Sequence, residues 1–134
     1  MIITDVDGVL TDGAIYKGAN GVELKRFTVE DGAGMAIARA AGFRIAFISG
    51  RFSEATASRA AELNIEDVYN GTLNKLNPYI ELKEKYGLED DEVAYIGDGL
   101  IDLVLLERVG VPISVKNAYP LVKEAAIYVT ETEG

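Results

Sequence analysis

The feature that most constrains the fold of this chain is a regular alternation of short apolar runs with longer amphipathic segments. The short runs are typical of strands buried on both faces, and the longer segments have the spacing of helices. Strands that alternate with helices predict a parallel sheet covered on both sides, and right-handed crossovers make such a sheet doubly wound. We therefore expect one α/β domain of Rossmann-like fold over residues 1–134.

Glycine, proline and serine residues set the expected boundaries of these elements. Gly42, Gly87 and Gly110 are suited to end helices. Ser53 is suited to cap the start of a helix, and Pro120 is suited to lie in the first turn of another. The expected strands are 1–4, 44–48, 67–69, 92–96, 111–115 and 127–130, and the expected helices are 34–41, 53–63, 76–86, 100–109 and 120–126. The Asn-Gly pair within residues 18–21 predicts a hairpin that joins 14–17 to 22–28.

Composition limits the chemistry that the chain supports. It has no cysteine and no histidine, so it lacks thiolate ligands, the usual general base and the commonest zinc ligand. Metal or acid–base chemistry must rest on carboxylates, whose oxygens favour a hard ion such as magnesium. The formal net charge of −9 argues against nonspecific nucleic-acid binding. With no long apolar run and no signal peptide before the first strand, we expect a cytoplasmic protein.

Polar residues follow several of the expected strands. Ligands of doubly wound sheets bind beyond the carboxyl ends of the strands, so residues with a chemical role should lie there. The residues found at these positions are Asp5 and Asp7, then Ser49, Gly50 and Arg51, and then Asp98 and Asp102. Loops that are distant in sequence therefore converge on one edge of the sheet.

The two acids after the first strand have complementary possible roles. Asp5 is placed to attack phosphorus and form an aspartyl phosphate. Asp7 is placed to protonate the leaving alcohol and then to activate water. A metal nearby would screen the repulsion between Asp5 and a phosphate dianion. Taken alone, this tripeptide is more typical of an ordinary acidic turn than of a catalytic site.

The later loops supply residues that suit phosphate and metal binding. Ser49 and the backbone amide of Gly50 precede a helix, as in a phosphate cradle. Lys75 opens a helix, where its charge opposes the macrodipole, and contact with a phosphoryl oxygen would explain it. Asp98 ends a strand and Asp102 follows one helical turn later on the same face, which suits magnesium.

The order and spacing of these motifs resemble the haloacid dehalogenase superfamily of phosphotransferases. More narrowly, the segments 5–13, 27–34, 49–51, 93–98 and 128–130 resemble those of the 3-deoxy-D-manno-octulosonate 8-phosphate phosphatases. That resemblance implies a domain without a large cap, a hairpin flap at about 14–28, and a homotetramer in which a neighbouring subunit closes each active site. It also implies hydrolysis of a sugar-acid phosphate with Mg2+ as cofactor.

The resemblance also implies roles for individual residues. Asp5 is the nucleophile and a metal ligand, and Asp7 is the general acid–base whose backbone carbonyl reaches the metal. Asp98 completes the metal site, with Asp102 beside it. The implied phosphate- and substrate-binding residues are Ser49, Gly50 and Lys75, with Arg51 orienting the substrate and Asp31 and Gly32 shaping the pocket.

Two departures from the family pattern leave alternatives open. Gly99 stands where the family usually has a second acid, and the chain stops at Gly134, before a glycine-rich tail that the family usually carries. The substrate is either the eight-carbon sugar-acid phosphate, a nine-carbon sugar acid 9-phosphate, or another small phosphometabolite. Other classes are a catalytically idle oligomeric binding module and a receiver-type signalling domain, although in receivers the phosphorylated Asp follows a later strand than the acid pair.

Overall fold

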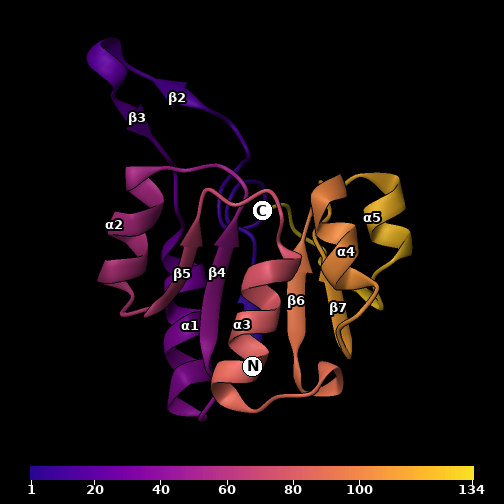
Figure 1. Ribbon diagram of the computed structural model, residues 1–134. Helices are drawn as coiled ribbons and strands as arrows, with labels where there is room; N and C mark the ends of the chain where they lie inside the picture. The colour runs from indigo at the N-terminus through magenta and orange to yellow at the C-terminus, as the bar shows by residue number, and fades with distance from the viewer.

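The computed structural model describes residues 1–134 and is built on a six-stranded, wholly parallel sheet with the order β5-β4-β1-β6-β7-β8. The strands are β1 (Ile2–Thr4), β4 (Ile45–Ser49), β5 (Asp67–Asn70), β6 (Ala94–Gly97), β7 (Val111–Ser114) and β8 (Tyr128–Val129). Helices cover both faces: α3 crosses in front of the sheet and α1 behind it (Figure 1). The predicted doubly wound α/β fold is confirmed.

The helices begin and end close to the expected boundaries, with two differences. They are α1 (Val29–Ala40), α2 (Glu54–Glu62), α3 (Leu76–Tyr86), α4 (Leu103–Leu106) and α5 (Pro120–Glu124). Helix α1 begins five residues early because the Thr28 hydroxyl accepts the Asp31 amide and caps its first turn. Helix α4 is short because Leu100–Asp102 forms a 3-10 turn before it. None of the helices has the length and apolar character to cross a bilayer.

The central strand β1 fixes the middle of the sheet. Ile3 pairs in register with Ala46 of β4 and with Tyr95 of β6, and all three residues are inaccessible to solvent. Because crossover helices cover both faces of a parallel sheet, its central strand carries buried side chains on both faces, as the sequence pattern indicated. The residue that follows β1, Asp5, therefore emerges at the centre of the carboxyl edge.

The predicted hairpin projects from that carboxyl edge (Figure 1). Its strands β2 (Tyr16–Lys17) and β3 (Glu23–Leu24) pair antiparallel around a 3-10 turn at Ala19–Gly21. Asn20, at φ 58°, has the left-handed backbone that an Asn-Gly hairpin tip requires. The paired strands are shorter than the expected 14–17 and 22–28, since only Tyr16 with Leu24 and Lys17 with Glu23 are paired.

The last residues of the chain lie beside the loop that follows β1. The Asn117 amide donates to the Gly8 carbonyl at 2.9 Å, and the Gly134 amide donates to Asn117 Oδ1 at 2.8 Å. The C-terminus consequently lies at the same edge of the sheet as the hairpin (Figure 1).

Candidate active site

The loop after β1 is shaped by its own apolar side chains and by one glycine. Val6 and Leu10 are buried, and the Leu10 amide donates to the Val6 carbonyl at 2.9 Å, which closes a tight turn. Gly8 has φ +85°, and a Cβ there would lie 2.2 Å from Asp98 Oδ2. Only glycine suits both the backbone and the space. The turn thus brings the β1 loop against the acid that follows β6.

Lys75 lies at the centre of the site and is wholly buried. Its ammonium group is 2.8 Å from Asp5 Oδ2 and 2.6 Å from Asp102 Oδ1, and it donates to the Tyr95 hydroxyl at 3.1 Å. All three N–H bonds are therefore used inside the protein. Sequence reasoning placed Lys75 against a phosphoryl group; in this structure it holds the carboxylate that would receive that group.

Asp102 is saturated by hydrogen bonds. Oδ1 accepts from Lys75 and from the Tyr95 hydroxyl, the latter at 2.5 Å. Oδ2 accepts from the backbone amides of Asp98 and Gly99 at 3.0 and 2.9 Å. Asp102 therefore organises the loop after β6. Sequence reasoning missed Tyr95, because an aromatic residue in an apolar strand gives no sign of a buried hydroxyl contact.

Asp5, Asp98 and Asp102 form a compact acidic cluster, with one carboxylate oxygen from each lying within 4.8 Å of the others. Burial raises the pKa of Asp5 to about 6, with Lys75 opposing and Asp102 adding to the rise. Burial, together with the charges of Asp5 and Asp102, raises the pKa of Asp98 to about 7. One lysine does not balance three carboxylates, so the cluster carries excess negative charge. Its ligand atoms are all oxygens, and both features suit a divalent cation.

Asp7 stands apart from this cluster and faces the hairpin. Its Oδ1 lies 2.6 Å from the ammonium group of Lys25, whose side chain is 2% exposed. Nearby, Arg51 Nη2 lies 2.5 Å from Glu23 Oε2. Sequence reasoning missed Lys25 and Glu23, since the hairpin sequence shows no sign that these side chains fold back onto the sheet edge.

A hollow of about 440 Å³ opens between these groups. It is lined by Asp5, Asp7, Gly13, Ile15, Gly50, Arg51, Leu73 and Ile101. Ser49 lies behind it, buried, with its hydroxyl donating to the Arg51 carbonyl at 3.0 Å. A Cβ on Gly50 would lie 2.8 Å from Ile101 Cδ1, so glycine keeps the backbone accessible at the floor of the hollow.

Asp31 and Gly32 lie outside this hollow. Asp31 belongs to the first turn of α1 and accepts the Thr28 hydroxyl at 2.8 Å. A Cβ on Gly32 would lie 3.1 Å from Arg59 Nη2. Within one chain these two residues shape the start of α1, and the structure does not bring them together with the other predicted site residues.

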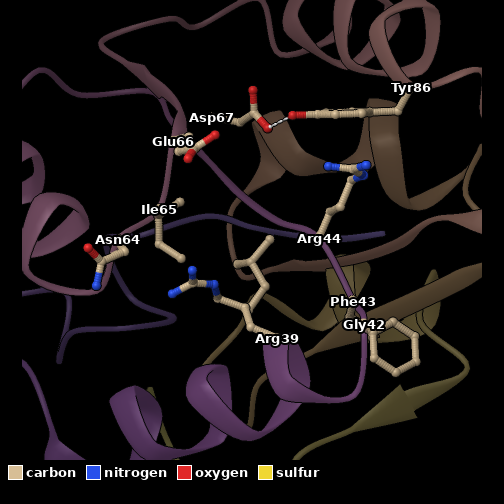
Figure 2. A pocket seen from close by; sticks show the side chains of 10 residues that line it. Arg39, Gly42, Phe43, Arg44, Asn64, Ile65, Glu66, Asp67 and Tyr86 are labelled. Atoms are coloured by element: carbon tan, nitrogen blue, oxygen red, sulfur yellow. Dashed lines mark hydrogen bonds between the residues drawn. The ribbon is translucent and has the colours of Figure 1, made fainter.

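A second hollow lies at the opposite edge of the sheet, beside the amino ends of β4 and β5, and lacks the features of the candidate active site (Figure 2). Several of its polar groups already have partners within the protein. Asp67 accepts the Tyr86 hydroxyl at 2.6 Å, the Arg44 guanidinium lies 4.2 Å from the Tyr86 ring centre, and Arg39 donates to the Leu63 carbonyl. The hollow at the carboxyl edge is lined instead by Asp5 of the carboxylate cluster and by Asp7, whose Oδ2 has no hydrogen-bond partner.

Comparison with known proteins identifies the family. The sequence profile of the haloacid dehalogenase-like hydrolases matches residues 45–133. The 3-deoxy-D-manno-octulosonate 8-phosphate phosphatase of Escherichia coli is 44% identical over 134 residues, covering 100% of this chain and 71% of that protein. The Yersinia pestis enzyme of the same name is 41% identical, covering 100% of this chain and 72% of its own length.

Solved structures agree with the sequence comparison. A haloacid dehalogenase superfamily hydrolase of subfamily III A from Legionella pneumophila superposes with a TM-score of 0.97 at 44% identity, covering 99% of this chain and 73% of that one. The Moraxella catarrhalis 3-deoxy-D-manno-octulosonate 8-phosphate phosphatase, solved with magnesium, phosphate and a KDO molecule, superposes with a TM-score of 0.96 at 38% identity, covering 99% and 76%. The chain therefore belongs to the haloacid dehalogenase-like hydrolases, and within them it is a phosphatase similar to the 3-deoxy-D-manno-octulosonate 8-phosphate phosphatases.

Proposed function

We propose that this phosphatase is a magnesium-dependent phosphomonoesterase that works through a phosphorylated Asp5. The observation that carries the proposal is the position of the Asp5 carboxylate. It borders the hollow, is fixed by Lys75 on one oxygen and by the Val6 amide at 2.6 Å on the other, and lies in a cluster with Asp98. A carboxylate held in one orientation at the edge of a cavity is suited to in-line attack on phosphorus.

The acidic cluster fits a bound magnesium ion. Asp5 and Asp98 would hold it through their carboxylates and Asp7 through its backbone carbonyl, while Asp102 keeps the β6 loop in place. Burial is the main cause of the raised pKa values of Asp5 and Asp98, and the charge of Lys75 offsets it only in part. When bound, the ion supplies charge neutralisation for the phosphate dianion and for the developing transition state.

The reaction divides between two acids. An oxygen of Asp5 attacks phosphorus while the bond from phosphorus to the ester oxygen breaks, and Asp7 gives its proton to the departing alkoxide. Asp7, now ionised, takes a proton from water as the water oxygen attacks phosphorus. The bond from phosphorus to Asp5 then breaks, which releases inorganic phosphate and restores the Asp5 carboxylate. Asp7 lies two residues after Asp5 and borders the same hollow, which supports this division.

Residues of the β4 loop are suited to hold the phosphoryl oxygens. The Gly50 amide borders the hollow, and the Ser49 hydroxyl needs only to exchange its bond to the Arg51 carbonyl for one to phosphate. Lys75, beside Asp5, would neutralise part of the charge that arrives there. Arg51, whose side chain is 39% exposed and lies 2.5 Å from Glu23, would exchange part of that ion pair to orient the remainder of the substrate.

We assign 3-deoxy-D-manno-octulosonate 8-phosphate as the preferred substrate. The names of the curated relatives and the KDO molecule in the Moraxella catarrhalis complex support this assignment. Arg51 lines the hollow and would bind the carboxylate of a sugar acid in exchange for its contact with Glu23. A nine-carbon sugar acid 9-phosphate shares the same chemistry at the phosphate end and is the alternative substrate to be tested beside it.

We further propose that the enzyme works in the cytoplasm as a homotetramer whose hairpins cover neighbouring active sites. Ile15, Val22 and Leu24 of the hairpin are each more than half exposed, and a two-stranded ribbon is barely stable alone. On α1, Val29 and Ile37 are 83% and 72% exposed. Sedimentation of the purified chain should give a tetramer, and a monomer at micromolar concentration would refute the shared-site arrangement.

The function is tested by measuring phosphate release from a panel of sugar phosphates with magnesium and with EDTA. We expect magnesium-dependent release that is fastest on 3-deoxy-D-manno-octulosonate 8-phosphate. Asp5→Asn should abolish release while leaving the circular dichroism spectrum unchanged. Release spread evenly over many substrates would refute the substrate assignment, and robust hydrolysis by Asp5→Asn would refute the nucleophile assignment.

A further inference from the structure

Lys25, at the base of the hairpin, is buried although nothing in the proposed chemistry uses it. Its side chain is 2% exposed, and its ammonium group contacts two polar partners: Asp7 Oδ1 at 2.6 Å and the Thr56 hydroxyl of α2 at 3.1 Å. Thr56 is itself wholly buried. Removing a charged ammonium group from water is unfavourable unless specific contacts offset it. This lysine therefore joins the hairpin, α2 and the loop after β1 at one point.

The two oxygens of Asp7 have different environments. Oδ1 is bound to Lys25, whereas Oδ2 is enclosed and has no hydrogen-bond partner. A buried polar atom without a partner is uncommon and calls for an explanation, and a catalytic role is one such explanation. The Asp7 side chain as a whole is 30% exposed and borders the hollow, and with Oδ1 held by Lys25 the rotation of its carboxylate is restricted.

We propose that Lys25 is a positioning residue that holds Asp7 in the orientation required for proton transfer to the leaving group. This inference rests on the proposed function, because it assigns Lys25 a role in that reaction. Lys25 keeps all of its own protons: the transferred proton passes from Asp7 to the ester oxygen as the bond to phosphorus breaks. The hairpin thus supplies part of the catalytic geometry within its own subunit, in addition to any contact with a neighbour.

The test uses leaving groups that differ in their need for a proton. An alkyl phosphate such as the sugar-acid phosphate needs the general acid, whereas p-nitrophenyl phosphate releases a stable phenolate without it. The value of kcat/KM depends on the steps up to departure of the leaving group. It does not depend on the later hydrolysis of the aspartyl phosphate. For Lys25→Met we expect kcat/KM on the alkyl phosphate to fall about 30- to 100-fold and that on p-nitrophenyl phosphate to fall less than about threefold.

A double-mutant cycle identifies the residue through which Lys25 acts. In an Asp7→Asn background, Lys25→Met should cause no further loss on the alkyl phosphate, because the acid that it positions is already absent. Lys17→Met is the matched control: Lys17 lies in the same hairpin, is 57% exposed and is 3.6 Å from Glu23, so its removal should leave both ratios unchanged. Thermal unfolding checks that each variant folds.

A second variant keeps the test decisive if Lys25→Met does not fold. Thr56→Val removes the hydroxyl that anchors the Lys25 ammonium group but preserves side-chain shape. It should give the same selective loss on the alkyl phosphate, by a smaller factor. Equal losses on both substrates, no loss, or a full additional loss in the Asp7→Asn background would overturn the positioning role. If the unaltered chain released phosphate from neither substrate, the proposed function itself would be refuted, and this inference with it.

Discussion

Replacing Lys75 with methionine should destabilise the metal-free protein severely. The substitution keeps the length of the side chain and removes the only cation among the buried carboxylates of Asp5 and Asp102, which now lie 2.8 and 2.6 Å from it. Breaking a buried ion pair by removing one partner costs about 3–5 kcal/mol, because the remaining charge stays buried without compensation. That is a large fraction of the roughly 5–15 kcal/mol by which a typical domain is stable.

The magnitude is measured by urea unfolding in EDTA at pH 8. With a slope of about 2 kcal/mol per molar urea, the expected loss moves the unfolding midpoint down by about 2 M. At pH 5 the deficit should shrink. Burial already raises the pKa of Asp5 to about 6 and that of Asp98 to about 7, so at the lower pH the cluster takes up protons and loses the charge that Lys75 balanced.

Lys83→Met provides the matched control. Lys83 lies in the helix that follows Lys75 and forms an ion pair of 2.5 Å with Asp90, whose side chain is 45% exposed. Exposed pairs contribute about 0–1 kcal/mol, so this variant should unfold nearly as the unaltered chain does. The reasoning is refuted if Lys75→Met costs no more than the control, or if its deficit is the same at pH 5 and pH 8.

The other predictions concern the acids of the site and the two glycines beside them. In EDTA, the free energy of unfolding of the unaltered chain should fall as the pH rises from about 4 to 8, since the folded state holds protons on Asp5 and Asp98 that the unfolded chain has already released. Urea titrations that show a rise over this range would contradict that sign. Gly8→Ala should abolish magnesium binding in calorimetry, because its Cβ would lie 2.2 Å from Asp98 Oδ2 at φ +85°; retained binding would contradict the packing argument. Gly99→Asp should tighten magnesium binding about tenfold by adding a carboxylate. The backbone there, at φ −101°, suits any residue, and the new Cβ would meet only Asp102 Oδ2, at 3.6 Å. An unchanged affinity would show that the second acid has no part in metal binding.

The parts of the fold that follow from local pattern were predictable. The turn glycines Gly42 and Gly87 and the Asn-Gly hairpin tip are found where expected, and α3 has the predicted bounds of Leu76–Tyr86. Element ends were less accurate where a cap or a 3-10 turn competes with the helix, as Thr28 does at α1 and residues 100–102 do before α4. These differences arise from single hydrogen bonds, which an apolar periodicity does not encode.

What the sequence determined by itself was the fold class and the positions of the acids. Apolar strands buried on both faces require a parallel sheet, and a parallel sheet gathers the residues that follow its strands at one edge, so Asp5 and Asp98 had to meet there. Which lysines form ion pairs with the acids of the site depends on the tertiary structure alone. In the sequence Lys75 stands out only by its unfavourable place at the start of a helix, and Lys25 does not stand out at all, because a lysine carries no local sign of burial. Their partners, Asp102 and Asp7, are 27 and 18 residues away, and only the order of the strands and the fold of the hairpin bring them within 2.6 Å.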